Sequence, residues 1–115
     1  MIDLELSTNS SPREAVAAVP SFLSIVESQA GAKCVVYLNY YFWRDAMGGT
    51  DAFSNNPLWL ANYTAAEQPS LMPAVWSKVT FWQYSGNGTL AGIVGAVDLD
   101  RFLGSFIDLR SLVPK

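Results

Sequence analysis

The chain has 115 residues, of which 10 are acidic and 7 are basic, and its formal net charge is −3. Half of its residues are hydrophobic and 13% are aromatic, which predicts one compact domain and excludes a disordered chain. The basic residues are scattered, so we expect no nucleic-acid-binding surface. The apolar stretches are shorter than the roughly 20 residues of a membrane helix, and the acidic start is unlike a signal peptide.

The side chains available for catalysis are few in kind. No histidine is present and Cys34 is the single cysteine, which excludes Ser-His-Asp and Cys-His catalysis, His-ligated metals and an internal disulfide. We therefore expect no metal ion and no cofactor. Carboxylates remain as the groups that could carry acid–base chemistry at neutral pH.

The first expected elements are a strand and a long helix. Residues 1–6 alternate apolar and acidic side chains, as in a short strand. A helix should begin at Pro12, with Ser11 and Glu14 as a capping box, and Gly31 is placed to end it. Pro20 falls inside this helix and predicts a kink or a break.

Four further strands are expected downstream. Residues 33–39 form an apolar run without alternation, as in a strand covered on both faces. The other expected elements are strands at 58–63, 79–84 and 95–99, a short helix at 40–46, a turn at 85–89 and a last helix at 101–109. This order predicts an α/β fold with about five mainly parallel strands and flanking helices.

Asp3 and Glu5 are the sharpest chemical feature of the sequence. Residues i and i+2 of a strand project to the same face, with Cα atoms about 6.5–7 Å apart. Mutual repulsion raises the pKa of one member, and a protonated acid beside an ionised carboxylate is what glycoside hydrolysis needs. Two solvated acids near a chain end would look the same, and the pair by itself favours that plainer interpretation.

A second acidic pair, Asp98 and Asp100, has the same spacing in the last expected strand. Asp98 follows an apolar residue at a strand end and is the better candidate for the inward-facing member. Asp100 precedes Arg101 and Phe102, and we interpret it as the N-cap of the final helix.

Aromatic and amide residues also follow the expected strands. Tyr63 stands beside Asn62 at one strand end, and Tyr84 stands beside Gln83 at another. Polar groups at the carboxyl ends of successive parallel strands are how barrels and open α/β sheets build active sites. Flat rings there could stack on sugars, although core packing is the commoner role of aromatic side chains.

Four motifs occur in an order that resembles a known family. They are Asp3-Leu4-Glu5, Leu58-Trp59-Leu60-Ala61-Asn62-Tyr63, Phe81-Trp82-Gln83-Tyr84-Ser85 and Val97-Asp98-Leu99-Asp100-Arg101-Phe102. The order and spacing resemble the family 25 glycoside hydrolases, the muramidases that cut peptidoglycan between N-acetylmuramic acid and N-acetylglucosamine. The similarity extends over nearly the whole chain.

The resemblance implies roles for individual residues. Glu5 would be the general acid, Asp3 would stabilise positive charge or orient the acetamido group of the substrate, and Asp98 would shape the electrostatics of the site. The candidate substrate-binding residues are Tyr37, Asn62, Tyr63, Gln83 and Tyr84. Trp59 and Trp82 would support the strands from behind.

The resemblance also implies a partial (β/α)-barrel of TIM type. The first half of the family's barrel, with its own active-site aspartate, has no counterpart here, so residues 1–115 would form a single domain resembling the C-terminal half of a muramidase barrel. Half a barrel leaves two sheet edges and an apolar face uncovered, and the mean hydropathy of +0.19 is high for a small monomer. We therefore expect a homodimer or a larger assembly.

Two hypotheses about function follow from the resemblance. The first is a lysozyme-type hydrolase with carboxylate acid/base catalysis that acts on peptidoglycan in the cell wall, outside the cell or after lysis. The second is a non-catalytic half-barrel that binds cell-wall saccharides or serves a structural role. The presence of Asp3, Glu5 and Asp98 favours the first, and the missing aspartate favours the second. The compartment is left open.

Overall fold

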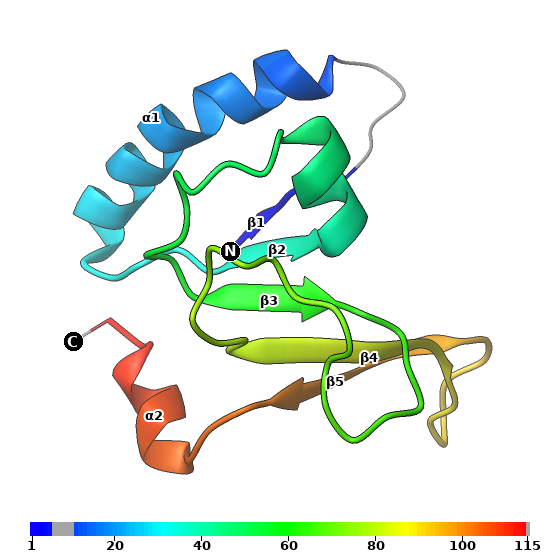
Figure 1. Ribbon diagram of the computed structural model, residues 1–115. Coiled ribbons are helices and arrows are strands. Elements are labelled where there is room, and N and C mark those ends of the chain that lie inside the picture. The colour runs from blue at the N-terminus through cyan, green and yellow to red at the C-terminus, as the bar shows by residue number, and fades with distance from the viewer. Residues whose placement is uncertain (6–10, 115) are drawn as a thin grey trace.

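The computed structural model describes residues 1–5 and 11–114, so Leu6 of the expected first strand lies outside the described residues. The elements in chain order are β1 (Ile2–Asp3), α1 (Pro12–Ala30), β2 (Val36–Asn39), the π-helical turn η1 (Phe42–Ala46), β3 (Leu58–Ala61), β4 (Phe81–Gly88), β5 (Val97–Phe102) and α2 (Phe106–Ser111) (Figure 1). None of the described helices is long and apolar enough to cross a membrane.

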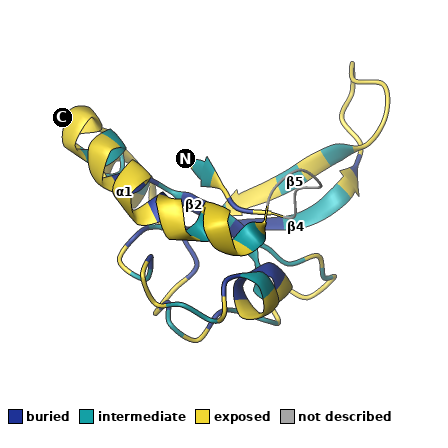
Figure 2. Ribbon diagram, turned by 90° about the horizontal axis from the view of Figure 1, so that it is seen from above, coloured by how far each residue is buried: buried dark blue, intermediate teal, exposed yellow. Residues whose placement is uncertain are grey.

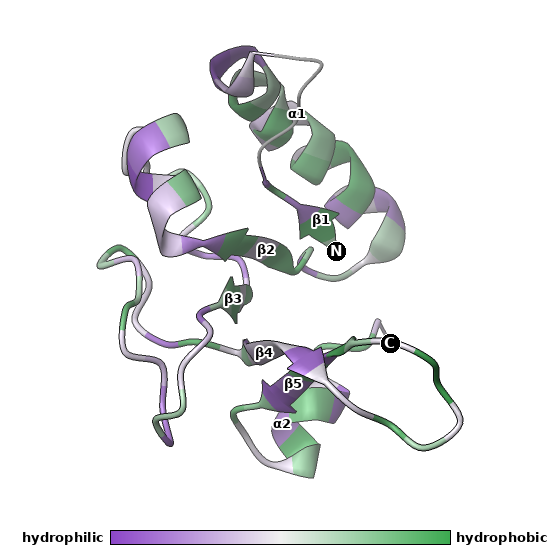
Figure 3. Ribbon diagram, turned by 90° about the vertical axis from the view of Figure 1, so that its right-hand side faces the viewer, coloured by the Kyte–Doolittle hydropathy of each residue, from purple (hydrophilic) through white to green (hydrophobic). Residues whose placement is uncertain are grey.

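The strands form one five-stranded sheet in the order β1-β2-β3-β4-β5. β1 to β4 are parallel neighbours, and β5 is antiparallel to β4. Seen from the side, the strands form an arc, with α1 and η1 on its outer, convex side and α2 beyond β5 (Figure 3). The described chain leaves the inner, concave side open. The predicted α/β fold, an open partial barrel of five mainly parallel strands, is confirmed.

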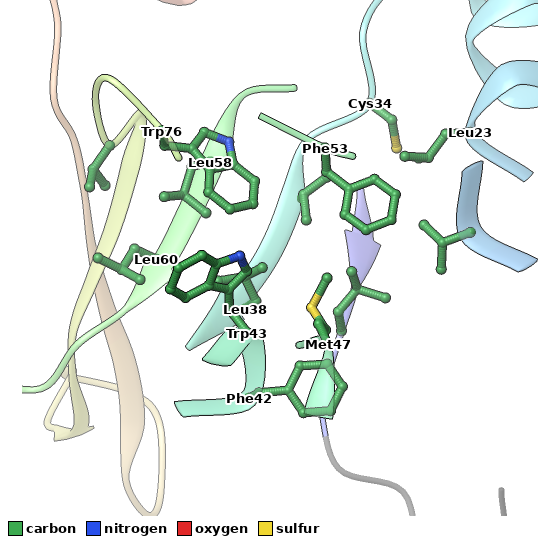
Figure 4. Packing of buried hydrophobic residues seen from close by; sticks show 14 of the residues in the cluster. Leu23, Cys34, Leu38, Phe42, Trp43, Met47, Phe53, Leu58, Leu60 and Trp76 are labelled. Atoms are coloured by element: carbon green, nitrogen blue, oxygen red, sulfur yellow. The ribbon is translucent and has the colours of Figure 1, made fainter. Parts of the chain in front are cut away.

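The hydrophobic core lies on the convex side of the sheet. Alternate positions of the three central strands supply five core residues that are exposed by 1% or less: Val36, Leu38, Leu58, Leu60 and Trp82. Val19 and Leu23 of α1 and Phe42 of η1 belong to the same buried cluster, part of which is drawn in Figure 4. The expectation that residues 33–39 are covered on both faces is wrong, because positions of β2 alternate between buried and half-buried.

α1 is one helix that runs through Pro20 without a break, so the predicted break is wrong. Pro20 lies on the exposed side of α1, where water can satisfy the carbonyl that a proline leaves without a partner. Ser11 is the N-cap but makes no side-chain cap, so the predicted capping box is wrong; its backbone carbonyl accepts from the N–H groups of Glu14 and Ala15 instead. Gly31 ends the helix at φ 67°, as predicted.

The expected turn at residues 85–89 is wrong, because β4 continues to Gly88. Gly88 allows the side chain of Leu99 on β5 to lie close to the β4 backbone, since a Cβ at Gly88 would lie 2.5 Å from Leu99 Cγ. The two strands are joined instead by residues 89–96, an exposed loop that projects from the sheet (Figure 2).

The last helix also begins later than expected. Residues 101–102 belong to β5, where they pair with β4, and α2 starts at Phe106. The N-cap of α2 is Ser105, which forms a capping box with Asp108, so the interpretation of Asp100 as the N-cap is wrong. Cross-strand pairing outweighed the local helix-start pattern in this segment.

Glu27 joins the end of α1 to two loops. Its carboxylate accepts hydrogen bonds from the backbone N–H of Cys34 at 3.0 Å, from Asn56 Nδ2 at 2.6 Å and from Lys33 Nζ at 2.9 Å. Burial by itself raises the pKa of Glu27, but the hydrogen bonds outweigh it and hold the pKa below its usual value. The ionised carboxylate therefore stabilises the connection that leads into β2.

We expect Glu27→Ala to lower the free energy of unfolding by about 1–3 kcal/mol, because the buried Asn56 amide and the Cys34 N–H lose their acceptor. Since the pKa of Glu27 is lowered on folding, its contribution is complete above the usual glutamate pKa and is lost as the pH falls through the folded value. Urea unfolding at several acidic pH values should therefore show the two proteins converging. Lys33→Ala removes only the exposed ion pair and should cost less than about 1 kcal/mol; an equal loss in both variants would contradict the prediction.

Candidate active site

Two cross-strand rows of side chains define the concave face. The first row contains Asp3, Tyr37, Trp59, Phe81 and Phe102. The second row, one pair further toward the carboxyl ends of the parallel strands, contains Asn39, Ala61, Gln83 and Asp100. The rings of the first row touch in sequence, with centroid distances of 5.6, 5.7 and 5.1 Å from Tyr37 to Phe102. Strand register therefore brings side chains from all five strands onto one surface.

Gln83 is the buried polar centre of this surface. Its side-chain oxygen Oε1 accepts a hydrogen bond from the hydroxyl of Tyr37 at 2.8 Å and another from the hydroxyl of Tyr63 at 2.9 Å. Gln83 is 5% exposed, whereas Tyr63 is 60% exposed. Three of the predicted substrate-binding residues are thus in direct contact, and one of them presents its ring to solvent.

The predicted catalytic carboxylates lie near these two tyrosines. Burial, together with negative charges on Tyr63, Glu5, Asp3 and Asp98, raises the pKa of Tyr37 to about 12. Burial also raises the pKa of Tyr63, with contributions from Asp98, Asp100 and Glu5. The charges of Asp3, Glu5 and Asp98 therefore all act on Tyr37, and those of Glu5 and Asp98 also act on Tyr63. Burial raises the pKa of Asp3 itself, which favours its protonated form.

Trp59 and Asp100 also face the concave side, which the sequence interpretation missed. The indole Nε1 of Trp59 donates a hydrogen bond to Asp100 Oδ1 at 2.6 Å. The expectation that Trp59 supports its strand from behind is therefore wrong, whereas Trp82 does lie in the core, 1% exposed. A signal was present in the sequence, because Trp59 alternates with Leu58 and Leu60, both of which point into the core.

Asn62 and Tyr84, also predicted to bind substrate, lie apart from the Tyr37–Gln83–Tyr63 contacts. Asn62 Oδ1 accepts hydrogen bonds from the backbone N–H and hydroxyl of Ser70 at 2.8 and 3.2 Å, which closes the loop at 62–70. Tyr84 packs against Trp82, with ring centroids 5.6 Å apart, and the guanidinium carbon of Arg101 lies 4.7 Å from the Tyr84 ring centre. The Asn62 side chain therefore bonds within its own loop, and the Tyr84 ring packs against neighbours in β4 and β5.

A separate hollow of about 740 Å³ lies at the amino ends of the parallel strands, the opposite end from the carboxylates. Its lining includes Lys33, Asn56, Trp76, Lys78 and Thr80. None of the predicted site residues lines this hollow. The chemistry-bearing side chains therefore gather at the other end of the sheet, where parallel-strand folds place their active sites.

The concave face offers carboxylates, two phenol hydroxyls and the carboxamides of Asn39 and Gln83. Among the described residues, no group of three or more His, Cys, Asp or Glu side chains is arranged to hold a metal ion. Of carboxyl groups on one surface, a protonated one can donate a proton to a leaving oxygen and an ionised one can stabilise positive charge on the neighbouring carbon. These are the two tasks of glycoside hydrolysis.

Comparison with known proteins agrees with this chemistry. The family model for glycosyl hydrolases family 25 matches residues 1–93. The "Uncharacterized protein YegX" of Escherichia coli O157:H7 is 31% identical over 113 residues, which are 98% of this chain and 39% of that protein. Lysozyme M1 of Streptomyces globisporus is 35% identical over 81 residues, which are 68% of this chain and 26% of the lysozyme.

A solved structure extends the comparison to three dimensions. The muramidase from Trichobolus zukalii superposes with a TM-score of 0.78 at 26% sequence identity. The match covers 96% of this chain and 53% of the muramidase. The chain therefore spans about half of that structure and 39% of the Escherichia coli relative.

Removing the charge of Asp98 should lower the pKa of both Tyr37 and Tyr63, because that charge opposes formation of either tyrosinate. The measurement is ultraviolet difference titration of Asp98→Asn, with Tyr37→Phe and Tyr63→Phe used to assign the transitions. Asp51→Asn serves as a control that removes an exposed acid from a loop. Unchanged tyrosine titrations in Asp98→Asn would contradict the placement of Asp98 beside the tyrosines.

Proposed function

The chain belongs to glycosyl hydrolase family 25, and from this membership we propose that it is a lysozyme-type hydrolase of peptidoglycan. The bond cleaved would be the glycosidic bond between N-acetylmuramic acid and N-acetylglucosamine. The observation that carries the proposal is the grouping of Asp3, Glu5 and Asp98 around Tyr37 and Tyr63 at the carboxyl ends of the parallel strands. The substrate would be the glycan strands of the cell wall.

In the proposed reaction, Glu5 is the general acid. Its carboxyl proton moves to the glycosidic oxygen while the bond from that oxygen to the anomeric carbon breaks, and positive charge spreads over the anomeric carbon and the ring oxygen. Asp3 and Asp98 stabilise this charge, and Asp3 also orients the acetamido group. Water then adds to the anomeric carbon, and the proton that it releases returns to Glu5.

The proposed groove for the sugar rings lies beside these carboxylates. Tyr63 offers an exposed ring for stacking on a sugar face, and Tyr37 and Gln83 form the floor next to it. In this proposal Asn62 and Tyr84 contribute indirectly, because they hold the loop and the strand from which Tyr63 and Gln83 project. The groove is rich in hydrogen-bond acceptors, which suits the hydroxyl-rich surface of a glycan.

We expect Glu5→Gln to lower the release of reducing ends from purified peptidoglycan by at least about 100-fold, because an amide cannot donate the proton that the leaving oxygen needs. Glu67→Gln, at an exposed position in the loop after β3, should leave the rate unchanged. Full activity in Glu5→Gln would exclude Glu5 as the general acid.

A non-catalytic saccharide-binding or structural half-barrel is the second candidate. It is favoured by the open concave side and by the match to about half of the muramidase structure. A protein of this kind would sediment with insoluble peptidoglycan while releasing no reducing ends. Sedimentation and release measured on the same samples therefore separate the two functions.

We also propose that the chain self-associates through the aromatic part of its concave face, and not through the side chains at the carboxyl ends of the strands that form the proposed groove. Its accessible surface is 7659 Å², whereas a compact monomer of its mass exposes about 6,200 Å². Its radius of gyration of 14.9 Å likewise exceeds the roughly 13 Å of a compact domain of this length. If each of two copies buried this excess surface, the dimer would bury about 3,000 Å² in total, which lies within the range of obligate homodimers. The half-buried rings of Trp59, Phe81 and Phe102 would be covered in such a dimer.

Light scattering at micromolar concentration should give the mass of at least two 12.6 kDa chains. Phe81→Asp, in the middle of the aromatic row, should shift the protein toward a single chain because burying the new charge is costly. Phe22→Asp, a matched change at a position 50% exposed on α1, should leave the assembly intact. A wild-type mass of one chain would contradict self-association.

A further inference from the structure

Two residues of β4 fix the position of the exposed Tyr63 ring. The first is Gln83, whose side-chain oxygen accepts a hydrogen bond from the hydroxyl of Tyr63 at 2.9 Å. The same oxygen accepts a hydrogen bond from the hydroxyl of Tyr37 at 2.8 Å, so the two phenol groups meet at one acceptor. Gln83 is 5% exposed and its strand is paired on both sides, so the acceptor is itself held firmly in place.

The second residue is Gly86, over which the far end of the Tyr63 side chain lies. A Cβ atom at Gly86 would lie 2.9 Å from the Tyr63 hydroxyl oxygen and 3.1 Å from Cε2 and Cζ. Atoms at those distances would clash, so any residue larger than glycine at position 86 would displace the Tyr63 ring. The clash involves only the tip of an exposed side chain, so the ring can swing away and the backbone need not move.

We propose that Gln83 and Gly86 are positioning residues that hold the Tyr63 ring as one wall of a saccharide-binding groove. This inference rests on the proposed function of the same site. An exposed tyrosine that could rotate freely would lose conformational entropy when a sugar ring stacks on it. The Tyr63 ring avoids that loss because the buried oxygen of Gln83 holds its hydroxyl and because Gly86, which has no side chain, leaves room for it.

The geometry also limits what the two hydroxyls can do for a ligand. Each hydroxyl donates its hydrogen bond to Gln83, so toward the groove each oxygen can only accept a hydrogen bond. The nearby carboxylates are acceptors when ionised. The groove therefore favours a ligand that presents donors, such as sugar hydroxyls and acetamido N–H groups.

The carboxamide of Gln83 suits this position better than a carboxylate would. It accepts both hydrogen bonds without adding a negative charge beside Asp3, Glu5 and Asp98. A further carboxylate there would raise the pKa of the neighbouring acids and tyrosines through like-charge repulsion. Gln83 thus holds the two tyrosine hydroxyls in place without adding a charge that would shift the pKa values of the acids.

The experiment measures binding of the β-1,4-linked tetramer of N-acetylglucosamine by isothermal titration calorimetry. Gln83→Leu and Gly86→Ala should each weaken binding about three- to tenfold, the range expected for loss of one positioned aromatic contact. Gln68→Leu and Asn87→Ala make comparable changes at exposed positions nearby and should bind as the wild type does. Urea unfolding of Gly86→Ala should match the wild type, since only the ring moves.

The decisive comparison repeats both substitutions in a Tyr63→Ala background. If Gln83 and Gly86 act through the Tyr63 ring, each substitution will weaken binding much less once the ring is gone. Equal losses in the two backgrounds would overturn the proposal, because the residues would then act on the fold. Wild-type affinity in both single variants, or no binding of the tetramer by the wild type, would also overturn it. If the wild type releases no reducing ends but the substitutions still depend on Tyr63, the proposed hydrolysis is wrong and the positioning of the ring stands.

Discussion

The register of the parallel strands is the constraint on which the rest of the structure depends. Side chains alternate with a period of two, so burial of Val36, Leu38, Leu58 and Leu60 on the convex side sends their neighbours to the concave side. A slip of one residue in β2 would exchange Tyr37 for a buried valine or leucine. The requirement to bury the aliphatic rows therefore fixes the positions of the polar and aromatic rows.

Negative charge and ordered tyrosines give the concave face its chemical character. Glu5, Asp3 and Asp98 all act on Tyr37, although they come from two widely separated parts of the chain. Gln83 links Tyr37 of β2 to Tyr63 beyond β3, so one buried amide couples three neighbouring strands. The antiparallel β5 is needed for this arrangement, because its direction returns Asp98 to the carboxyl ends of the parallel strands.

Sequence reasoning succeeded where the local sequence pattern and the pairing of strands in the sheet favour the same secondary structure. The expected strands at the start of the chain and before Tyr63 are present as β1 and β3, so Asp3 and Tyr63 lie at the carboxyl ends of parallel strands. Glu5 follows β1 and does not belong to it, and Gln83 lies within β4 and not at its end. Sequence reasoning failed where pairing with another strand outweighed local signals. Gly86 and Gly88 resemble a turn, but they lie in β4 because Tyr63 and Leu99 pack closely over them. Asp100 resembles a helix cap, but it lies in β5 beside Trp59.

The sequence by itself determined the class of fold, the restriction of acid–base chemistry to carboxylates and the family to which the chain belongs. Those features depend on residue types and short spacings, which can be read from the chain directly. Only the tertiary structure decided that Tyr37 and Tyr63 share the oxygen of Gln83 and that Trp59 donates a hydrogen bond to Asp100. Such contacts join residues about 20 to 46 positions apart, and the curvature and register of the sheet determine which of them meet.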